Sequence, residues 1–229
     1  MEKNVSAQEK NVSAQERNVS ASVIKRLPRY YRYLGELISC GIERISSKEL
    51  SRRMGVTASQ IRQDLNCFGG FGQQGYGYNV EYLYGEISAI LGLNHGYAAI
   101  LVGAGNIGRA FAVNTNFEKR GFRLIGIFDT DPKKIGMKVG DLTISDYNDI
   151  KEFIEKNRPT MAILAVPRTV VNRVAHELID CGIRAFMNFS YAEISADESI
   201  AVENVHLSDS LMRLCYKISA NEKNSEKEI

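Results

Sequence analysis

The chain has 229 residues, 44% of them hydrophobic, which suffices for one large or two small globular domains with ordinary cores. It shows no charged-then-apolar leader and no apolar run near 18 residues, so we expect a cytoplasmic protein without a membrane span. Its four cysteines (Cys40, Cys67, Cys181, Cys215) form no C-x-x-C pair, which argues against a zinc site and against a disulfide framework.

The net charge of +2 conceals an asymmetry along the chain. Residues 22–80 contain nine lysines and arginines against four acidic residues, whereas residues 81–220 contain 15 against 17. A basic front part joined to a mildly acidic second part predicts a polyanionic partner for the front part, although charge alone does not say which polyanion.

The first segment, residues 1–21, contains a seven-residue repeat with one valine in each copy. A coiled-coil seam needs two apolar positions per heptad, so we expect a solvated, disordered tail here, and a second tail over residues 220–229. Apolar residues then recur at helical spacing and predict a first helix that ends near Gly41, with Pro28 tolerable only near its first turn; they are Ile24, Leu27, Tyr31, Leu34 and Ile38.

Two capping-box patterns follow, Ser46 with Glu49 and Thr57 with Gln60. They predict two short helices separated by only three residues, which is typical of a helix-turn-helix. On the second of these helices, the apolar residues Ile61, Leu65 and Phe68 fall on one side. The residues that point away from them suit hydrogen bonding to bases and phosphates in a major groove; they are Ser59, Arg62, Gln63 and Asn66. An ordinary solvated helix face is the alternative.

The glycine-rich segment 69–78 predicts a β-hairpin, as expected for a wing that follows a recognition helix. Its tip carries Gln73 and Gln74, so a contact with DNA there depends on hydrogen bonds rather than on charge. We therefore predict a winged-helix DNA-binding domain over residues 22–80, followed by a connecting helix and hinge over residues 81–96.

Residues 103–108 read G-A-G-N-I-G and lie between an apolar run, residues 98–102, and a predicted helix that extends to about Arg120. A glycine turn at a strand-to-helix junction is typical of a site for the pyrophosphate of a dinucleotide. A second apolar run ends at Asp129, 21 residues after Gly108, which is the spacing of the carboxylate that binds the adenosine ribose. This carboxylate would repel a 2′-phosphate, so we expect NAD(H) rather than NADP(H), with Lys133 and Lys134 weakening the preference.

Strand and helix patterns alternate through the rest of the chain and predict a doubly wound parallel sheet, a Rossmann-like domain over residues 97–205. We expect helices over 146–156 and 170–181, strands over 161–166 and 183–189, and an exit from the domain at Glu203 and Asn204. Val166, Pro167 and Asn188 lie at predicted strand ends, where an apolar pocket favours the uncharged ring of NADH over NAD+. A last helix over residues 206–219 must bury an apolar stripe against its own domain or a second subunit; the stripe is Leu207, Leu211, Leu214, Cys215 and Ile218.

From about residue 22 to residue 219 the chain resembles the Rex family of redox-sensing transcriptional repressors. The resemblance rests on the segments RLPRYYRYL (26–34), RISSKEL (44–50), VTASQIRQDL (56–65), GYGYNV (75–80) and GAGNIGRA (103–110). It implies a winged helix fused to a Rossmann domain, a homodimer that exchanges its C-terminal helix, and binding to palindromic operator DNA that NADH releases and NAD+ permits. Many members carry basic residues where this chain has Gln73 and Gln74, and the repeated tail is not part of the family pattern.

The candidate site residues follow from these patterns and from the matching segments. For NAD(H) they are Gly103, Ala104, Gly105, Asn106, Ile107, Gly108, Arg109, Asp129, Val166, Pro167 and Asn188, with no metal. For DNA they are Arg29, Ser46, Ser47, Lys48, Thr57, Ser59, Gln60, Arg62, Gln63, Asn66, Gln73, Gln74 and Tyr76.

Two other functions fit parts of the sequence. An NAD-dependent oxidoreductase with an added N-terminal module is the first, but few residues remain for a substrate domain. None of the three histidines, His95, His176 and His206, has a clear catalytic context. A plain repressor with a vestigial nucleotide fold is the second. We expect a regulator for which the dinucleotide is a signal and not a reagent.

Overall fold

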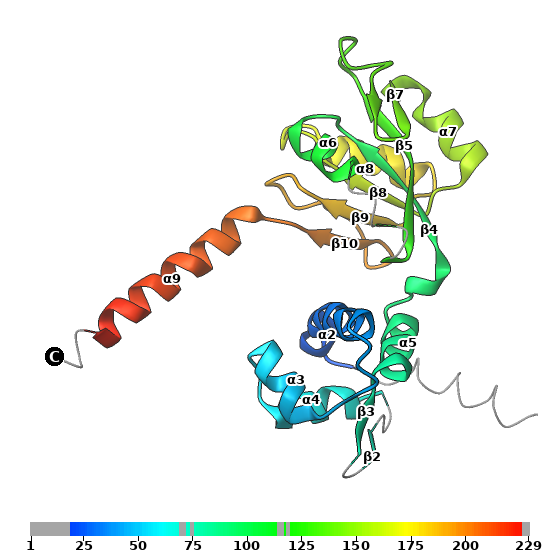
Figure 1. The fold of residues 1–229 in the computed structure, drawn as a ribbon. Helices are drawn as coiled ribbons and strands as arrows, with labels where there is room; N and C mark the ends of the chain where they lie inside the picture. Colours follow the sequence, from blue (N-terminus) through cyan, green and yellow to red (C-terminus); the bar gives the residue numbers. More distant parts are fainter. Residues whose placement is uncertain (1–18, 69–71, 74–75, 114–116, 118–119, 226–229) are drawn as a thin grey trace, which may run out of the picture. The chain divides into compact units, whose positions relative to one another are not determined.

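The computed structural model divides the chain into two compact units, one through Asn94 and one from His95 onward (Figure 1). It describes residues 19–68, 72–73, 76–113, 117 and 120–225. Each unit has its own hydrophobic core.

The N-terminal unit consists, in its described part, of helices around a small antiparallel sheet. The helices are α2 (Ala21–Ser39), α3 (Ser47–Met54), α4 (Ala58–Asn66) and α5 (Val80–Ile90). The strands are β1 (Arg44–Ile45), β2 (Gly72–Gln73) and β3 (Gly77–Asn79), in the order β1-β3-β2. The β2–β3 pair follows α4 at the place of the predicted wing, and Gln74 at its expected tip lies outside the described residues.

Helix α2 begins three residues before Ile24 and buries a face adjacent to the predicted one. Its buried residues are Val23, Leu27, Tyr30, Leu34 and Leu37, whereas Ile24 is 40% exposed. The sequence has neighbouring apolar residues at 30–31 and 37–38, so helical spacing alone cannot choose between the two faces. Because the helix begins at Ala21, Pro28 lies in its interior and not in its first turn. Proline has no N–H, so Pro28 cannot donate the helical hydrogen bond to the carbonyl of Ile24.

Both predicted N-caps are confirmed. The Ser46 hydroxyl accepts a hydrogen bond from the Glu49 N–H, and the Thr57 hydroxyl accepts one from the Gln60 N–H, each at 3.1 Å. The glycine that ends α3, Gly55, has a φ of 62°, a conformation that favours glycine. These caps fix the tight turn between α3 and α4.

Helix α5 belongs to the core of the N-terminal unit, although its position in the sequence suggested a connector between domains. Its residues Val80, Leu83 and Ile87 are fully buried in the same cluster as Leu27 and Leu34 of α2. Because an isolated helix cannot bury these residues by itself, its packing on α2 extends the N-terminal unit to Asn94.

The C-terminal unit is built on a sheet with the order β10-β9-β8-β4-β5-β7-β6; among these described strands, only β6 runs antiparallel to its neighbour. Its strands are β4 (Tyr97–Val102), β5 (Phe122–Asp129), β6 (Lys138–Val139), β7 (Leu142–Asp146), β8 (Met161–Leu164), β9 (Ala185–Asn188) and β10 (Ala201–Asn204). Its helices are α6 (Asn106–Ala112), α7 (Ile150–Asn157), α8 (Val171–Asp180) and α9 (Leu207–Ser225), with short 3₁₀ turns η1 (Leu93–His95) and η3 (Tyr147–Asp149).

The predicted doubly wound parallel sheet is confirmed, with several differences in its elements. Helix α6 ends at Ala112 instead of near Arg120, and the expected helix over 146–156 is the end of β7 followed by η3 and α7. The expected exit from the domain at residues 203–204 is the end of strand β10. Helix α9 continues to Ser225 and so occupies most of the segment expected to be a disordered tail.

The chain order creates a crevice beside β4. From β4 the chain proceeds through β5 to β7 on one side, and then returns to place β8 on the other side of β4. Such a reversal leaves a crevice at the carboxyl ends of the strands, where ligands bind in open parallel sheets.

Candidate dinucleotide site and nucleic-acid interface

The glycine turn at residues 103–108 joins β4 to α6, and its three glycines have different structural roles. A Cβ atom on Gly103, whose φ is +98°, would overlap the carbonyl of Ala165, and one on Gly108 would overlap the carbonyl of Gly103. A Cβ on Gly105 would meet nothing within 4 Å. The first and third glycines are therefore required by close packing of the backbone, while the second leaves open space at the start of α6.

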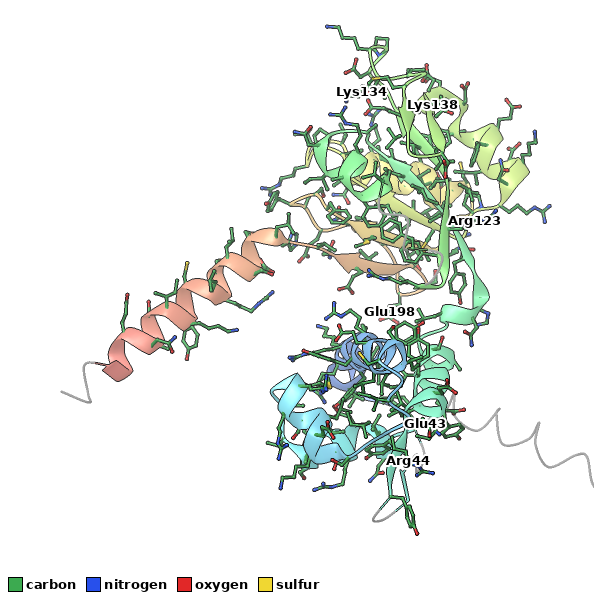
Figure 2. The ribbon with its side chains drawn as sticks, in the orientation of Figure 1. Glu43, Arg44, Arg123, Lys134, Lys138 and Glu198 are labelled. Atoms are coloured by element: carbon green, nitrogen blue, oxygen red, sulfur yellow. The ribbon has the colours of Figure 1, made fainter. Side chains whose placement is uncertain are left out.

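Asp129, at the end of β5, is joined to this turn. Its Oδ2 atom accepts hydrogen bonds from the Ala104 N–H at 2.7 Å and from Lys134 Nζ at 3.1 Å, and its Oδ1 accepts one from the Asp131 N–H at 2.8 Å. Burial opposes the charged form, but the hydrogen bonds from Asp131, Lys134 and Ala104 outweigh it and hold the pKa of Asp129 below its ordinary value. The carboxylate is ionised at neutral pH. It orients both the glycine turn and the loop that follows β5, on which Figure 2 labels Lys134.

A cavity of about 920 Å³ connects the glycine turn with Asp129 and with one side of α8. Of the predicted ligand residues it brings together Gly103, Gly105, Asp129, Val166 and Pro167. Its remaining lining residues are Val102, Thr130, Asp131, Lys134, Tyr147, Asn148, Ile150, Lys151, Ala165, Val170, Arg173, Val174, Glu177, Leu178 and Cys181. The cavity thus combines backbone N–H groups at a helix start, an ionised carboxylate and an apolar wall, as a dinucleotide requires.

Some predicted ligand residues do not line this cavity. Asn188 is fully buried; its amide nitrogen donates to the carbonyl of Ala192 and to Asn204 Oδ1, and its Oδ1 accepts from the Ser190 N–H. Its side chain joins the ends of β9 and β10, which is a structural role. On α6, the Arg109 guanidinium donates to Asn106 Oδ1, and Ile107 is 45% exposed.

The exposed face of α4 agrees with its predicted geometry. Ile61 and Leu65 are buried and Phe68 packs on the same core, whereas Ser59, Arg62, Gln63 and Asn66 are exposed. These four residues line one shallow hollow of about 500 Å³, together with Cys67. Arg62 donates a hydrogen bond to Ser47 Oγ on α3 at 3.1 Å, which links the two helices at this surface.

The other DNA-binding candidates differ in how free their side chains are. Arg29, Lys48 and Tyr76 are exposed. The Arg29 guanidinium lies 5.9 Å from the ring centre of Tyr33, and the guanidinium of Arg44 lies 6.0 Å from that of Tyr76. The hydroxyls of Ser46 and Thr57 cap helices, and the Gln60 side chain donates to Asp64 instead of pointing to solvent.

The sequence patterns did not reveal the role of Asp64, which is fully buried on α4. Its carboxylate accepts hydrogen bonds from Arg26, Tyr30 and Gln60. Burial disfavours its charge, but the hydrogen bonds from these three residues hold the pKa of Asp64 below its ordinary value. An acidic residue between predicted core positions, such as Asp64 between Ile61 and Leu65, is the signal that sequence reasoning could have used.

The apolar stripe of α9 is uncovered in the single chain. Leu207, Leu211, Leu214 and Ile218 are each at least 50% exposed, and Cys215 is exposed as well. Just before this helix, His206 stacks on Tyr191 with ring centres 5.9 Å apart. Within the single chain, the domain that carries α9 does not bury the stripe, which leaves a second subunit as the predicted alternative.

Within the described residues there is no cluster of histidine, cysteine and acidic side chains of the kind that holds a metal ion. None of the described helices is both long enough and apolar enough to span a bilayer.

Two protein-family models match the chain. One, described as "Putative DNA-binding protein N-terminus", matches residues 18–66, and the other, "CoA binding domain", matches residues 94–192. The chain is similar to curated proteins named "Redox-sensing transcriptional repressor Rex". The protein from Clostridium perfringens (strain SM101 / Type A) is 51% identical and that from Clostridium beijerinckii 53%, each over 88% of this chain and 95% of the relative.

Solved structures give the same result. RSP in complex with beta-NAD+ and operator DNA is 49% identical, with a TM-score of 0.83 over 92% of this chain and 97% of that one. RSP in complex with beta-NADH is 46% identical, with a TM-score of 0.84 over 91% and 98%; RSP is described as a Rex-family repressor. The identity, the coverage and the two-unit fold together show that this chain belongs to the Rex family of redox-sensing transcriptional repressors.

Proposed function

We propose that this protein is a transcriptional repressor that binds operator DNA and is released from it when NADH binds. One observation carries the proposal: a single chain combines a helix-turn-helix with an exposed polar face and a glycine-turn cavity with an ionised carboxylate. The RSP structures support it, because that protein is described in complex with NAD+ and operator DNA and in complex with NADH.

On the DNA side, the exposed face of α4 enters the major groove. Arg62 and Gln63 contact base edges, and Ser59 and Asn66 extend the same surface. Other charged and polar groups of the N-terminal unit contact phosphates and fix the register of the protein on the duplex; they are Arg29, Ser47, Lys48 and Tyr76, with Gln73 and Gln74 of the predicted wing.

On the ligand side, the turn at residues 103–108 binds the pyrophosphate of NAD(H) and Asp129 binds the adenosine ribose. Because Asp129 is ionised, it accepts hydrogen bonds from ribose hydroxyls and repels a 2′-phosphate, so NAD(H) is preferred over NADP(H). No metal takes part in this site.

The switch requires a difference in affinity between the two oxidation states of the dinucleotide. Reduced nicotinamide is uncharged, whereas the oxidised ring is cationic, and Val166 and Pro167 provide an apolar wall beside the glycine turn. Burying a charge against such a wall is costly, so NADH is favoured. NADH then releases DNA by binding more tightly to the conformation that does not fit the operator.

The apolar stripe of α9 is buried in a homodimer, where each helix packs on the partner subunit. Exposed leucines along one helix face are unfavourable in water, and two-fold symmetry matches two half-sites of a palindrome. A repressor of this kind acts in the cytoplasm, on the DNA, and needs no membrane.

An NAD-dependent oxidoreductase is the alternative function, and one experiment separates the two. A gel shift with a palindromic operator, in which NADH is titrated against fixed NAD+, is expected to show loss of the complex without consumption of NADH. Retention of the complex at saturating NADH would contradict the proposal. Release that requires turnover of the dinucleotide would favour the enzyme.

A further inference from the structure

The cavity continues beyond Asp129 to a pair of polar residues that the glycine turn does not use. Tyr147, the first residue after β7, donates its phenolic hydrogen to Glu177 Oε2 on α8 at 2.7 Å. Both residues line the cavity and both are partly buried. Val170, Val174 and Leu178 supply an apolar wall around this end, so a flat ring with one polar edge suits it.

The Tyr147–Glu177 pair can accept further hydrogen bonds but cannot donate one. Burial and the bond to Glu177 raise the pKa of Tyr147, so its hydroxyl stays protonated and its single hydrogen is committed to Glu177. Within the described part of the chain, the carboxylate of Glu177 has no second hydrogen-bond partner. The atoms left to a ligand are therefore the free carboxylate oxygen and the lone pairs of the tyrosine oxygen, all of them acceptors.

A ligand edge that donates hydrogen bonds satisfies these acceptors. The exocyclic amine of adenine is its only N–H donor once the base is attached to ribose. Hypoxanthine carries a carbonyl oxygen at that position, and its single N–H lies on the neighbouring ring nitrogen. We propose that Tyr147 and Glu177 recognise the exocyclic amine of adenine and so restrict this site to adenine dinucleotides. The inference rests on the proposed function, in which the cavity holds NAD(H) with its ribose at Asp129.

Other polar groups at this end of the cavity discriminate less. Asn148 both donates and accepts, and Lys151 and Arg173 are cations that suit a carbonyl oxygen. All three are exposed, so water competes for them and weakens any preference they impose. The partly buried acceptors lose more when a carbonyl oxygen faces them, because the oxygen offers them no hydrogen and the N–H of hypoxanthine is displaced to the neighbouring ring position.

The test compares the binding of NADH with that of its hypoxanthine analogue, reduced nicotinamide hypoxanthine dinucleotide, by calorimetry on the full chain. The wild-type protein is expected to bind the analogue at least about tenfold more weakly than NADH. Glu177→Gln supplies an amide that can donate to the carbonyl oxygen, so the ratio of the two affinities is expected to fall toward one. Glu155→Gln, an exposed change of the same type on α7, is expected to leave the ratio unchanged.

The outcomes are distinct. If the wild-type protein binds both dinucleotides with equal affinity, the inference is overturned, and no variant is needed to show it. The proposed function, in which NADH is the signal, would still stand. A preference for NADH that survives in a folded Glu177→Gln variant would show that other residues recognise the base, and would also overturn it. If neither dinucleotide binds, the proposed function fails and the inference fails with it.

Discussion

Arg26 on α2 and Asp64 on α4 form a two-point ion pair, with the Nε and Nη2 atoms of the arginine each 2.7 Å from a carboxylate oxygen. Asp64 is fully buried, and Tyr30 and Gln60 donate to the same carboxylate. The pair joins α2 to α4, the helix that presents Arg62 and Gln63 at its exposed face. The orientation of α4, which we propose as the recognition helix, therefore depends on a carboxylate that is buried in the N-terminal unit.

We expect Asp64→Ala to destabilise the N-terminal unit by about 2 to 3 kcal/mol, because hydrogen bonds to a buried charge are lost together. Specific operator binding is expected to weaken as well, while NADH binding is unchanged. Urea unfolding measures the first effect and a gel shift the second. Glu43→Ala, an exposed change in the same unit, is expected to stay within about 0.5 kcal/mol of the wild type. Equal stability of the two variants would contradict this role of Asp64.

The same carboxylate predicts a dependence of stability on pH. The pKa of Asp64 is lower in the folded protein than its ordinary value of 3.8, so its ionised form stabilises the fold above that value. This contribution is lost as the pH falls through the lower folded-state pKa. Unfolding midpoints of the wild type and Asp64→Asn, measured from pH 7 down to pH 3, are expected to converge on acidification. A constant difference between them would argue against an ionised Asp64.

Replacement of Asp129 by alanine removes both the ribose acceptor and the hydrogen bond to the Ala104 N–H. We expect NADH affinity to fall at least about tenfold, since hydrogen bonds to a charged group are worth about 1.5 to 3 kcal/mol. Operator binding without dinucleotide is expected to persist. Asp141→Ala, an exposed change in the same unit, serves as the control in calorimetry. An unchanged NADH affinity in Asp129→Ala would rule out this residue as the ribose ligand.

Arg62→Ala is expected to cost about 1 to 3 kcal/mol of specific operator binding, the usual value of an arginine that contacts a base. NADH binding should be unaffected, because Arg62 lies in the other unit. Arg123→Ala removes an exposed arginine from the C-terminal unit and controls for net charge. A uniform loss of affinity for operator and for unrelated DNA would identify Arg62 as a phosphate contact only.

Introduction of glutamate at Leu211 and Leu214 is expected to convert the proposed dimer to monomers, because each places a charge on the apolar stripe of α9. Tyr216→Glu changes the other face of the helix and should leave the dimer intact. Sedimentation measures the outcome. A double variant that remains dimeric would show that another surface joins the subunits.

The parts of the molecule that could be predicted from sequence are those governed by local rules. Capping at Ser46 and Thr57, the glycine turn and the alternation of the sheet depend on short patterns, and the structure confirms them. The buried face of α2 and the membership of α5 in the N-terminal core depend on packing between segments distant in sequence.

In the candidate sites, too, sequence spacing predicts the position of a residue but not the partners of its side chain. Asp129 could be placed by its spacing from the glycines, but spacing gives no information about the partners of a side chain. Asn188 and Gln60 are polar residues in predicted site segments, yet their amides are engaged in hydrogen bonds inside the protein. Tyr147 and Glu177, 30 residues apart, meet only because β7 and α8 converge on one cavity.

The most direct test of the central claim is the fluorescence anisotropy of a labelled palindromic operator, selected from random DNA by the protein itself. Total dinucleotide and salt are held constant while the fraction of NADH is raised from none to all. We predict a fall in anisotropy to the value of free DNA as NADH replaces NAD+, with no NADH consumed. Anisotropy that stays at the bound value across the whole range would contradict the account.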